Sequence, residues 1–116
     1  DMAVGMMAVA QKKLERTQVK WSEDAAVCVV MASKGYPENY DTGFEIIGLD
    51  DPGHSIVFHS GTRKNNTGKY VTDGGRVLSV VSIDNSVSEA RLKTYASLDT
   101  IKFKGSFHRT DIALNK

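Results

Sequence analysis

The sequence predicts an α+β domain, in which a small curved antiparallel sheet or partial barrel is covered by one amphipathic helix and preceded by an N-terminal helix. Three observations support this fold class. Several short apolar segments recur at hairpin spacing with Gly, Asn and Pro between them, as strands do in antiparallel sheets. A later segment carries apolar side chains at helical intervals. The length of 116 residues suits one compact domain, so residues 1–116 are expected to form a single unit.

The first half of the chain predicts one helix and two strands. Residues 2–14 are rich in Met, Ala, Leu, Gln and Lys and lack proline, which favours a helix that ends before the β-branched segment 17–21. The apolar run at residues 24–33 predicts a fully buried strand. Residues 33–43 are punctuated by Gly, Pro and Asn and predict a loop, after which residues 44–49 predict a short strand.

The middle of the chain predicts three further strands. Residues 55–61 alternate between two faces, with Ile56 and Phe58 on one side. Residues 62–68 are typical of a hairpin connection, and the short strand that follows leads into a pair of glycines. Residues 76–83 are apolar and predict the strand that leaves this pair.

The clearest helix comes next. Ser86 and Glu89 have the spacing of a capping box, which satisfies free backbone groups at the start of a helix. The expected apolar face of this helix consists of Val87, Ala90, Thr94, Leu98 and Ile101. Residues 106–112 predict a closing strand.

Composition excludes several classes of protein. The formal net charge of +1 gives no support to a nucleic-acid or anionic-membrane surface, because both need a cationic excess on one face. The apolar runs are shorter than the roughly 20 residues of a membrane-spanning helix. The lone Cys28 lies among apolar neighbours and is expected to be a buried thiol in a reducing compartment, without a redox or nucleophilic role. Asp1 is an unusual first residue, which suggests a piece of a longer chain.

No complete catalytic set is visible. His54, His59 and His108 lie far apart and match no zinc-ligand spacing, so no metal site is expected in this chain. Ser60 does not lie in a nucleophile elbow, and the chain contains neither a P-loop nor a Gly-x-Gly-x-x-Gly motif.

Two glycine-containing segments, residues 57–62 and 71–78, are the best candidates for a site. Asp73-Gly74-Gly75 alone is consistent with a plain hairpin turn, in which the glycines take positive φ angles. A hairpin would bring the two segments together, however. Their backbone amides, with the side chains of His59, Thr62 and Arg76, could then hold a phosphate group.

Four motifs occur in an order that is typical of one family. They are "GYP" at residues 35–37, His59-x-Gly61-Thr62, Gly-Gly-Arg-Val-Leu at residues 74–78, and Arg109-x-Asp111-Ile112. Over residues 21–112 the chain resembles the C-terminal domain of phosphoribosylamine–glycine ligase, also called glycinamide ribonucleotide synthetase. It departs from the family pattern at Ser60, where alanine is usual, and at Ala113, where glycine is usual, and in both cases one small residue replaces another.

The resemblance implies an ATP-grasp ligase of purine (IMP) biosynthesis. In this family ATP phosphorylates the glycine carboxylate, and the amine of 5-phosphoribosylamine attacks the acyl phosphate to give glycinamide ribonucleotide, ADP and phosphate. ATP and Mg²⁺ or Mn²⁺ are bound outside this domain. The fragment alone is therefore expected to be inactive, with no catalytic residue and no cofactor of its own. The full enzyme is expected in the cytoplasm, acting on small molecules.

The resemblance also implies a role for the domain within the enzyme. It is expected to pack on the ATP-grasp core and to wall the phosphoribosylamine side of the cleft, with residues 1–20 as a helical connector. The Met-rich segment 2–9 is expected to expose an apolar surface toward that core. The residues expected to contact the phosphoribosyl phosphate are Gly74, Gly75, Arg76, His59, Gly61 and Thr62.

Two other kinds of protein fit a small barrel. Biotinyl and lipoyl carriers share a barrel-sandwich-hybrid architecture, but they present a lysine within Met-Lys-Met, and no lysine here is flanked by methionine. A barrel that binds single-stranded nucleic acid would need aromatic residues in a basic groove, which the near-neutral charge disfavours.

Overall fold

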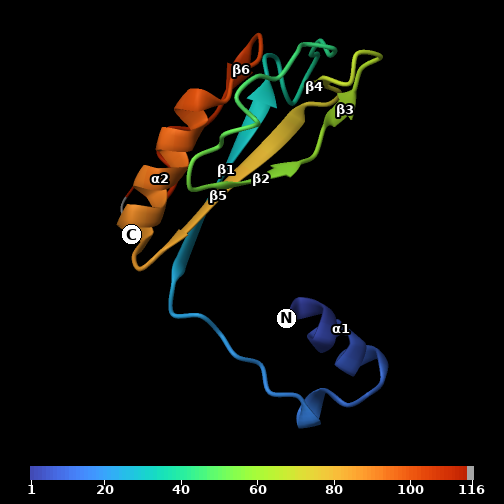
Figure 1. Ribbon diagram of the computed structural model, residues 1–116, viewed down its shortest axis with the longest axis vertical. Coiled ribbons are helices and arrows are strands. Elements are labelled where there is room, and N and C mark those ends of the chain that lie inside the picture. Colours follow the sequence, from blue (N-terminus) through green and yellow to red (C-terminus); the bar gives the residue numbers. More distant parts are fainter. Residues whose placement is uncertain (115–116) are drawn as a thin grey trace.

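The computed structural model describes residues 1–114, and in it the N-terminal helix lies apart from the sheet (Figure 1). Helix α1 spans Met2–Ala10, and a short 3-10 helix, η1, spans Leu14–Arg16. The side chain of Asp1 caps α1 by accepting a hydrogen bond from the amide of Ala3 at 2.8 Å. The helix predicted over residues 2–14 is thus confirmed in its first part. Within residues 1–114, no helix has the length and apolar character needed to cross a membrane.

The main sheet has four antiparallel strands in the spatial order β2-β5-β1-β6. Their bounds are Ile56–His59 for β2, Arg76–Asp84 for β5, Ala25–Ser33 for β1 and Ser106–Phe107 for β6. The α+β class is therefore confirmed, and the sheet is open rather than closed into a barrel.

A separate hairpin is formed by β3, Thr62–Lys64, and β4, Tyr70–Thr72. The short strand before the pair of glycines is confirmed, but the first part of the connection predicted over residues 62–68 is itself a strand, β3. The strand predicted over residues 44–49 is wrong. This segment makes only two isolated bridges, from Glu45 to Val71 and from Ile47 to Lys102. Its first residues lie along β4, because the amide of Ile46 donates to the carbonyl oxygen of Tyr70 at 2.9 Å and the amide of Thr72 donates to the carbonyl oxygen of Phe44 at 2.9 Å. The segment then crosses to a different part of the fold, where Ile47 pairs with Lys102.

Helix α2, Val87–Thr100, covers one face of the main sheet (Figure 1). The Oγ atom of Ser86 accepts a hydrogen bond from the amide of Glu89 at 3.2 Å, which confirms the predicted cap. The side chains that this helix buries are Ala90, Thr94, Ser97 and Leu98. Ala90 and Leu98 belong to the same hydrophobic core as residues of the sheet, among them Val29, Met31, Leu78 and Val80.

The opposite face of the sheet is not covered within the described chain. Val27 and Val29 of β1 point into the core, while Cys28 and Val30, which alternate with them, are exposed. The predictions of a fully buried strand and of a buried Cys28 are therefore wrong. An apolar run with residues on both faces is typical of a strand covered on both sides, and here α2 covers only one.

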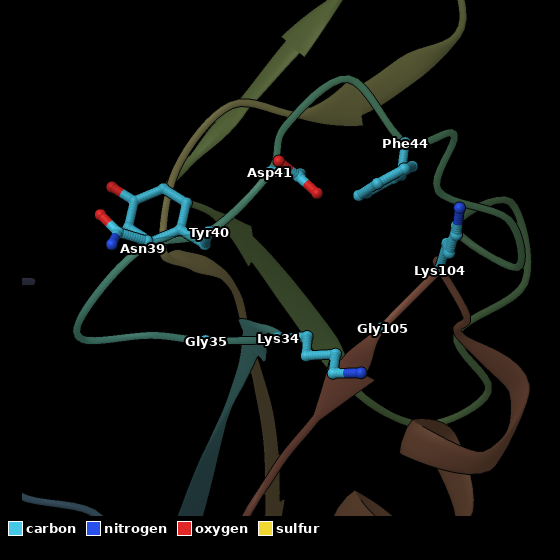
Figure 2. Close-up of a pocket in the computed structure, with 8 residues that line it drawn as sticks. All are labelled: Lys34, Gly35, Asn39, Tyr40, Asp41, Phe44, Lys104 and Gly105. Carbon is cyan, nitrogen blue, oxygen red and sulfur yellow. The ribbon is translucent and has the colours of Figure 1, made fainter.

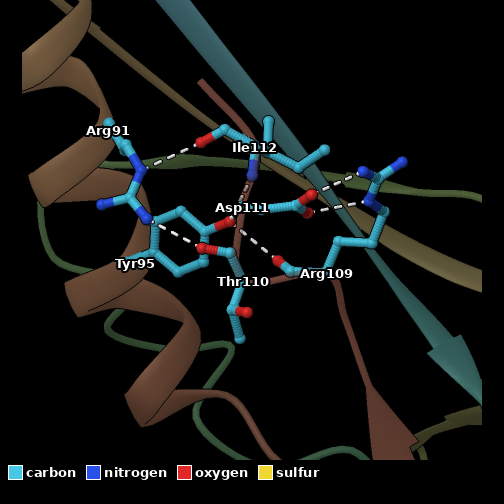
Figure 3. A network of polar contacts seen from close by, with 6 residues as sticks. All are labelled: Arg91, Tyr95, Arg109, Thr110, Asp111 and Ile112. Carbon is cyan, nitrogen blue, oxygen red and sulfur yellow. Dashed lines mark hydrogen bonds and ion pairs between the residues drawn. The ribbon is translucent and has the colours of Figure 1, made fainter. Parts of the chain in front are cut away.

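Residues 108–112 do not continue β6, so the predicted closing strand is limited to Ser106–Phe107. Side chains of α2 hold this segment instead (Figure 3). Arg91 donates to the carbonyl oxygens of Ile112 at 2.9 Å and Thr110 at 2.8 Å. The hydroxyl of Tyr95 donates to the carbonyl oxygen of Arg109 at 2.7 Å and accepts from the amide of Ile112 at 3.2 Å.

The closing motif Arg109-x-Asp111-Ile112 is explained by this arrangement. The guanidinium of Arg109 forms a two-pronged pair with the carboxylate of Asp111, at 2.9 and 2.7 Å, and thereby lowers the pKa of that carboxyl. The ion pair within the motif therefore stabilises the turn at residues 109–112, and hydrogen bonds from α2 hold this turn against the helix. Ala113, which follows, has a φ of 56°, in the left-handed region that glycine adopts without strain.

Candidate functional site

The two glycine segments predicted from the sequence lie side by side at one end of the main sheet. Gly61 connects β2 to β3, and its amide donates to the carbonyl oxygen of Arg76 at 2.9 Å. The amide of Asp73 donates in turn to the carbonyl oxygen of Gly61 at 2.7 Å. This confirms the predicted proximity of the segments, because the β3–β4 hairpin returns the chain to the end of β2.

Close packing, and not turn conformation, explains the glycines. A Cβ atom on Gly61 would lie 2.7 Å from the carbonyl oxygen of Arg76 and 2.8 Å from the Cα atom of Gly74. A Cβ atom on Gly75 would collide with the ring of Tyr36 and lie 3.0 Å from that of Tyr40. Neither Gly74 nor Gly75 has a positive φ angle, so the plain turn with positive φ is wrong.

Two tyrosines line this region, Tyr36 of the "GYP" motif and Tyr40, which no motif indicated. Tyr36 and Tyr40 belong to the loop between β1 and residue 44, and their ring centroids lie 6.4 Å apart. The peptide bond between Tyr36 and Pro37 is cis. The "GYP" motif was the only sequence signal for these rings, and it could not show that the ring of Tyr36 rests on Gly75.

Arg76 opens onto a hollow of about 530 Å³. The hollow is lined by Val30, Tyr36, Tyr40, Ser60, Gly75, Arg76 and Ser79. Arg76 is exposed, and within residues 1–114 its guanidinium makes no ion pair and no hydrogen bond. The nearby Arg63 differs, because it pairs with Asp73 at 3.2 Å. A guanidinium without a protein partner is available to an anionic ligand.

The side chains of His59 and Thr62 do not line this hollow. The Nδ1 atom of His59 lies 2.9 Å from the hydroxyl of Thr62, within hydrogen-bond distance. The imidazole also packs on the ring of Tyr70, with centroids 4.5 Å apart. The backbones of the two segments meet at Gly61, Gly74 and Arg76, while the side chains of His59 and Thr62 contact each other and the hairpin.

A second hollow, of about 640 Å³, is also lined by Tyr40 (Figure 2). Its rim carries Lys34 and Lys104, with Asp41 and Phe44 facing them. The ammonium group of Lys104 lies 5.1 Å from the centroid of the Phe44 ring, a cation–π distance. Neither lysine forms an ion pair with the residues described, so this end of the domain presents three unpaired cations to a ligand.

Metal ligands do not gather in the described part of the chain. No group of three or more His, Cys, Asp or Glu side chains in residues 1–114 is placed to hold an ion. Magnesium prefers several oxygen ligands, and the hollows offer only Asp41 as a carboxylate. The residues present therefore do not fit the metal that a triphosphate would bring.

Comparison with known families gives one match that covers most of the chain. The family described as "Phosphoribosylglycinamide synthetase, C domain" matches residues 26–115.

Individual relatives carry related names. The chain is 43% identical over 106 residues to phosphoribosylamine–glycine ligase of Caldanaerobacter subterraneus subsp. tengcongensis, covering 91% of this chain and 25% of that protein. It is 44% identical over 115 residues to the ligase of Caulobacter vibrioides, covering 97% of this chain and 27% of that protein. The "Bifunctional purine biosynthetic protein purD" of Dictyostelium discoideum is 41% identical over 116 residues, covering 97% of this chain and 14% of that protein.

The fold has a counterpart among solved structures. The crystal structure of phosphoribosylamine–glycine ligase from Thermotoga maritima matches with a TM-score of 0.76 and 30% sequence identity, covering 93% of this chain and 27% of that one. The chain thus spans about a quarter of the length of the ligases that it matches.

Proposed function

The chain belongs to the family of phosphoribosylglycinamide synthetase C domains, and we propose that it acts as the C-terminal domain of a phosphoribosylamine–glycine ligase. The full enzyme joins glycine to 5-phosphoribosylamine and converts ATP to ADP and phosphate. The relatives that support this proposal share 43% and 44% identity over nearly the whole chain. Some relatives are named as the ligase alone and one is named as a bifunctional protein. The proposal therefore concerns the ligase activity only.

Within that enzyme, this domain binds the phosphate of 5-phosphoribosylamine through Arg76. The main support for this assignment is the unpaired guanidinium of Arg76, which lines a hollow together with Gly75. Arginine presents a planar fork of donors that matches phosphate oxygens in two contacts at once. Gly75 carries no side chain, so the rings of Tyr36 and Tyr40 can lie against its backbone and line the hollow beside Arg76.

The role of the domain is binding and orientation. The reaction needs a nucleophilic amine from the substrate and a phosphoryl group from ATP, and the hollows supply cations rather than an acid–base pair. Holding the substrate phosphate at a fixed point positions its amine for attack on the acyl phosphate. The groups that bind ATP and its metal belong to the parts of the enzyme outside these residues.

Replacing Arg76 by alanine in the full-length ligase tests the assignment. The Michaelis constant for 5-phosphoribosylamine should rise, while those for ATP and glycine should change little, because their sites lie elsewhere.

A further inference from the structure

We propose that the uncovered face of the main sheet is the surface on which the rest of the ligase polypeptide packs. This face, called the open face below, consists of Ala26, Cys28, Val30, Ile56, Phe58, Ser79, Val81 and Ile83. The proposal rests on the proposed function, because it needs a larger ligase around this domain. The new element is the identity of the surface through which the domain contacts the rest of the ligase.

The register of the strands places these side chains together. Directly paired residues of an antiparallel sheet point to the same face. Cys28 is paired with Val81, and Val81 is paired with Ile56 on its other side. Ser79 is likewise paired with Val30 and with Phe58. The open face is therefore one continuous surface across β2, β5 and β1.

This surface is apolar and accessible within the domain. The exposed fractions are 51% for Ile56, 53% for Phe58 and 52% for Ile83. None of the side chains that form the open face carries a charge. A contiguous apolar surface of this kind marks an interaction site, since single apolar residues scattered over a surface are ordinary but patches are not.

The sequence of β1 also indicates a covering partner. Strands with water on one face alternate apolar and polar residues, whereas strands covered on both faces are apolar throughout. Residues 25–32 are all apolar or cysteine, yet α2 covers only the side of Val27, Val29 and Met31. The pattern of β1 therefore matches a sheet with a second covering layer that residues 1–114 do not supply.

The rest of the ligase is the occupant that the observations favour. The chain covers 25% to 27% of the ligases it matches, so most of such a polypeptide lies outside it. Val30 and Ser79 belong to the open face and also line the hollow of Arg76. A part of the ligase that packs on the open face would therefore form one side of the hollow and shield the contact between Arg76 and the phosphate from water.

The reactivity of Cys28 in the full-length ligase tests this proposal. Cysteines outside residues 1–116 are replaced by serine, and the rate of reaction of Cys28 with a thiol reagent is measured under native conditions. The matched control is Leu92→Cys in a Cys28→Ser background, because Leu92 is 64% exposed on α2, away from the sheet. We expect Cys28 to react roughly tenfold or more slowly than the control, because labelling would require local opening.

Equal rates at the two positions would overturn the proposal. Protection of Cys28 that is lost on dilution to the monomer would assign the open face to a second copy, and would overturn it as well. As a second measurement, Phe58→Asp should lower the melting temperature of the full-length ligase and Leu92→Asp should not. The Arg76 kinetics can fail while Cys28 is protected, or the reverse, so the two proposals are separable.

Discussion

Gly61 and Gly74 meet backbone against backbone, so closely that a Cβ atom on Gly61 would lie 2.8 Å from the Cα atom of Gly74. The same atom would lie 2.7 Å from the carbonyl oxygen of Arg76. This contact joins the end of β2 to the start of β5 and sets the position from which Arg76 reaches its hollow. The site is therefore built on a backbone contact that no other residue type permits.

Gly61→Ala should destabilise the domain by about 1–3 kcal/mol, because the atoms that the new methyl group meets are backbone and cannot rotate away. Urea unfolding of the 116-residue chain measures the loss. The matched control is Gly5→Ala in α1, where a Cβ atom would meet nothing within 4 Å. A Gly61→Ala variant as stable as the parent chain would refute the close contact.

Tyr95→Phe should lower the free energy of unfolding by about 1 kcal/mol, because it removes one hydrogen bond to Arg109 and leaves the amide of Ile112 without its acceptor. Tyr40→Phe serves as the control, since the Tyr40 hydroxyl makes no hydrogen bond with the residues described. Equal unfolding midpoints for the two variants would show that the hydrogen bonds of the Tyr95 hydroxyl contribute nothing to stability.

Ala113→Gly should raise the free energy of unfolding by about 0.5–1 kcal/mol. A left-handed φ of 56° strains alanine by about 1–2 kcal/mol, and the greater freedom of glycine in the unfolded chain offsets part of the gain. Ala96→Gly on the exposed side of α2 is the opposite control and should destabilise by about 0.5–1 kcal/mol. Thermal unfolding of both variants measures these changes. A lower melting temperature for Ala113→Gly than for the parent chain would contradict the strain at Ala113.

The 116-residue chain alone should neither bind Mg²⁺-ATP tightly nor form glycinamide ribonucleotide. Its described residues offer lysines for phosphate but no cluster of carboxylates for the metal. Isothermal titration with Mg²⁺-ATP is the direct measurement. Tight binding at one ATP per chain would place the nucleotide site, against expectation, within this domain.

Elements stabilised by nearby residues were predictable from the sequence. The cap formed by Ser86 and Glu89 spans a single turn, and the hairpin of β3 and β4 is closed by residues 65–69. In both cases the groups that satisfy the backbone lie within a few residues, so composition and spacing suffice to locate them.

Features that depend on distant segments were not predictable in the same way. Cys28 has apolar neighbours that indicate burial, but the layer that would bury it is not part of the described domain. Residues 44–49 have the composition of a strand, yet their partners, Val71 and Lys102, belong to different parts of the fold. Pairing across such separations is set by the packed structure rather than by local propensity.

The candidate site was predictable in its backbone and not in its side chains. Residues 57–62 and 71–78 were expected to meet, and they do. The direction of each side chain depends on the register and on the loop that follows β1, which is why the place of Tyr36 and Tyr40 in the site was not predicted. The same register turns His59 toward Tyr70 and away from Arg76.

The effect of Arg76→Ala on the kinetics of the full-length ligase tests the central claim most directly. Charge-assisted contacts contribute about 1.5–3 kcal/mol, so kcat/KM for 5-phosphoribosylamine should fall about tenfold to somewhat over a hundredfold, through a higher KM. The matched control is Arg109→Ala, since that guanidinium pairs with Asp111 and does not line the hollow. It should leave all three Michaelis constants unchanged. An Arg76→Ala enzyme with the KM of the parent for 5-phosphoribosylamine would contradict the claim that this domain holds the substrate phosphate.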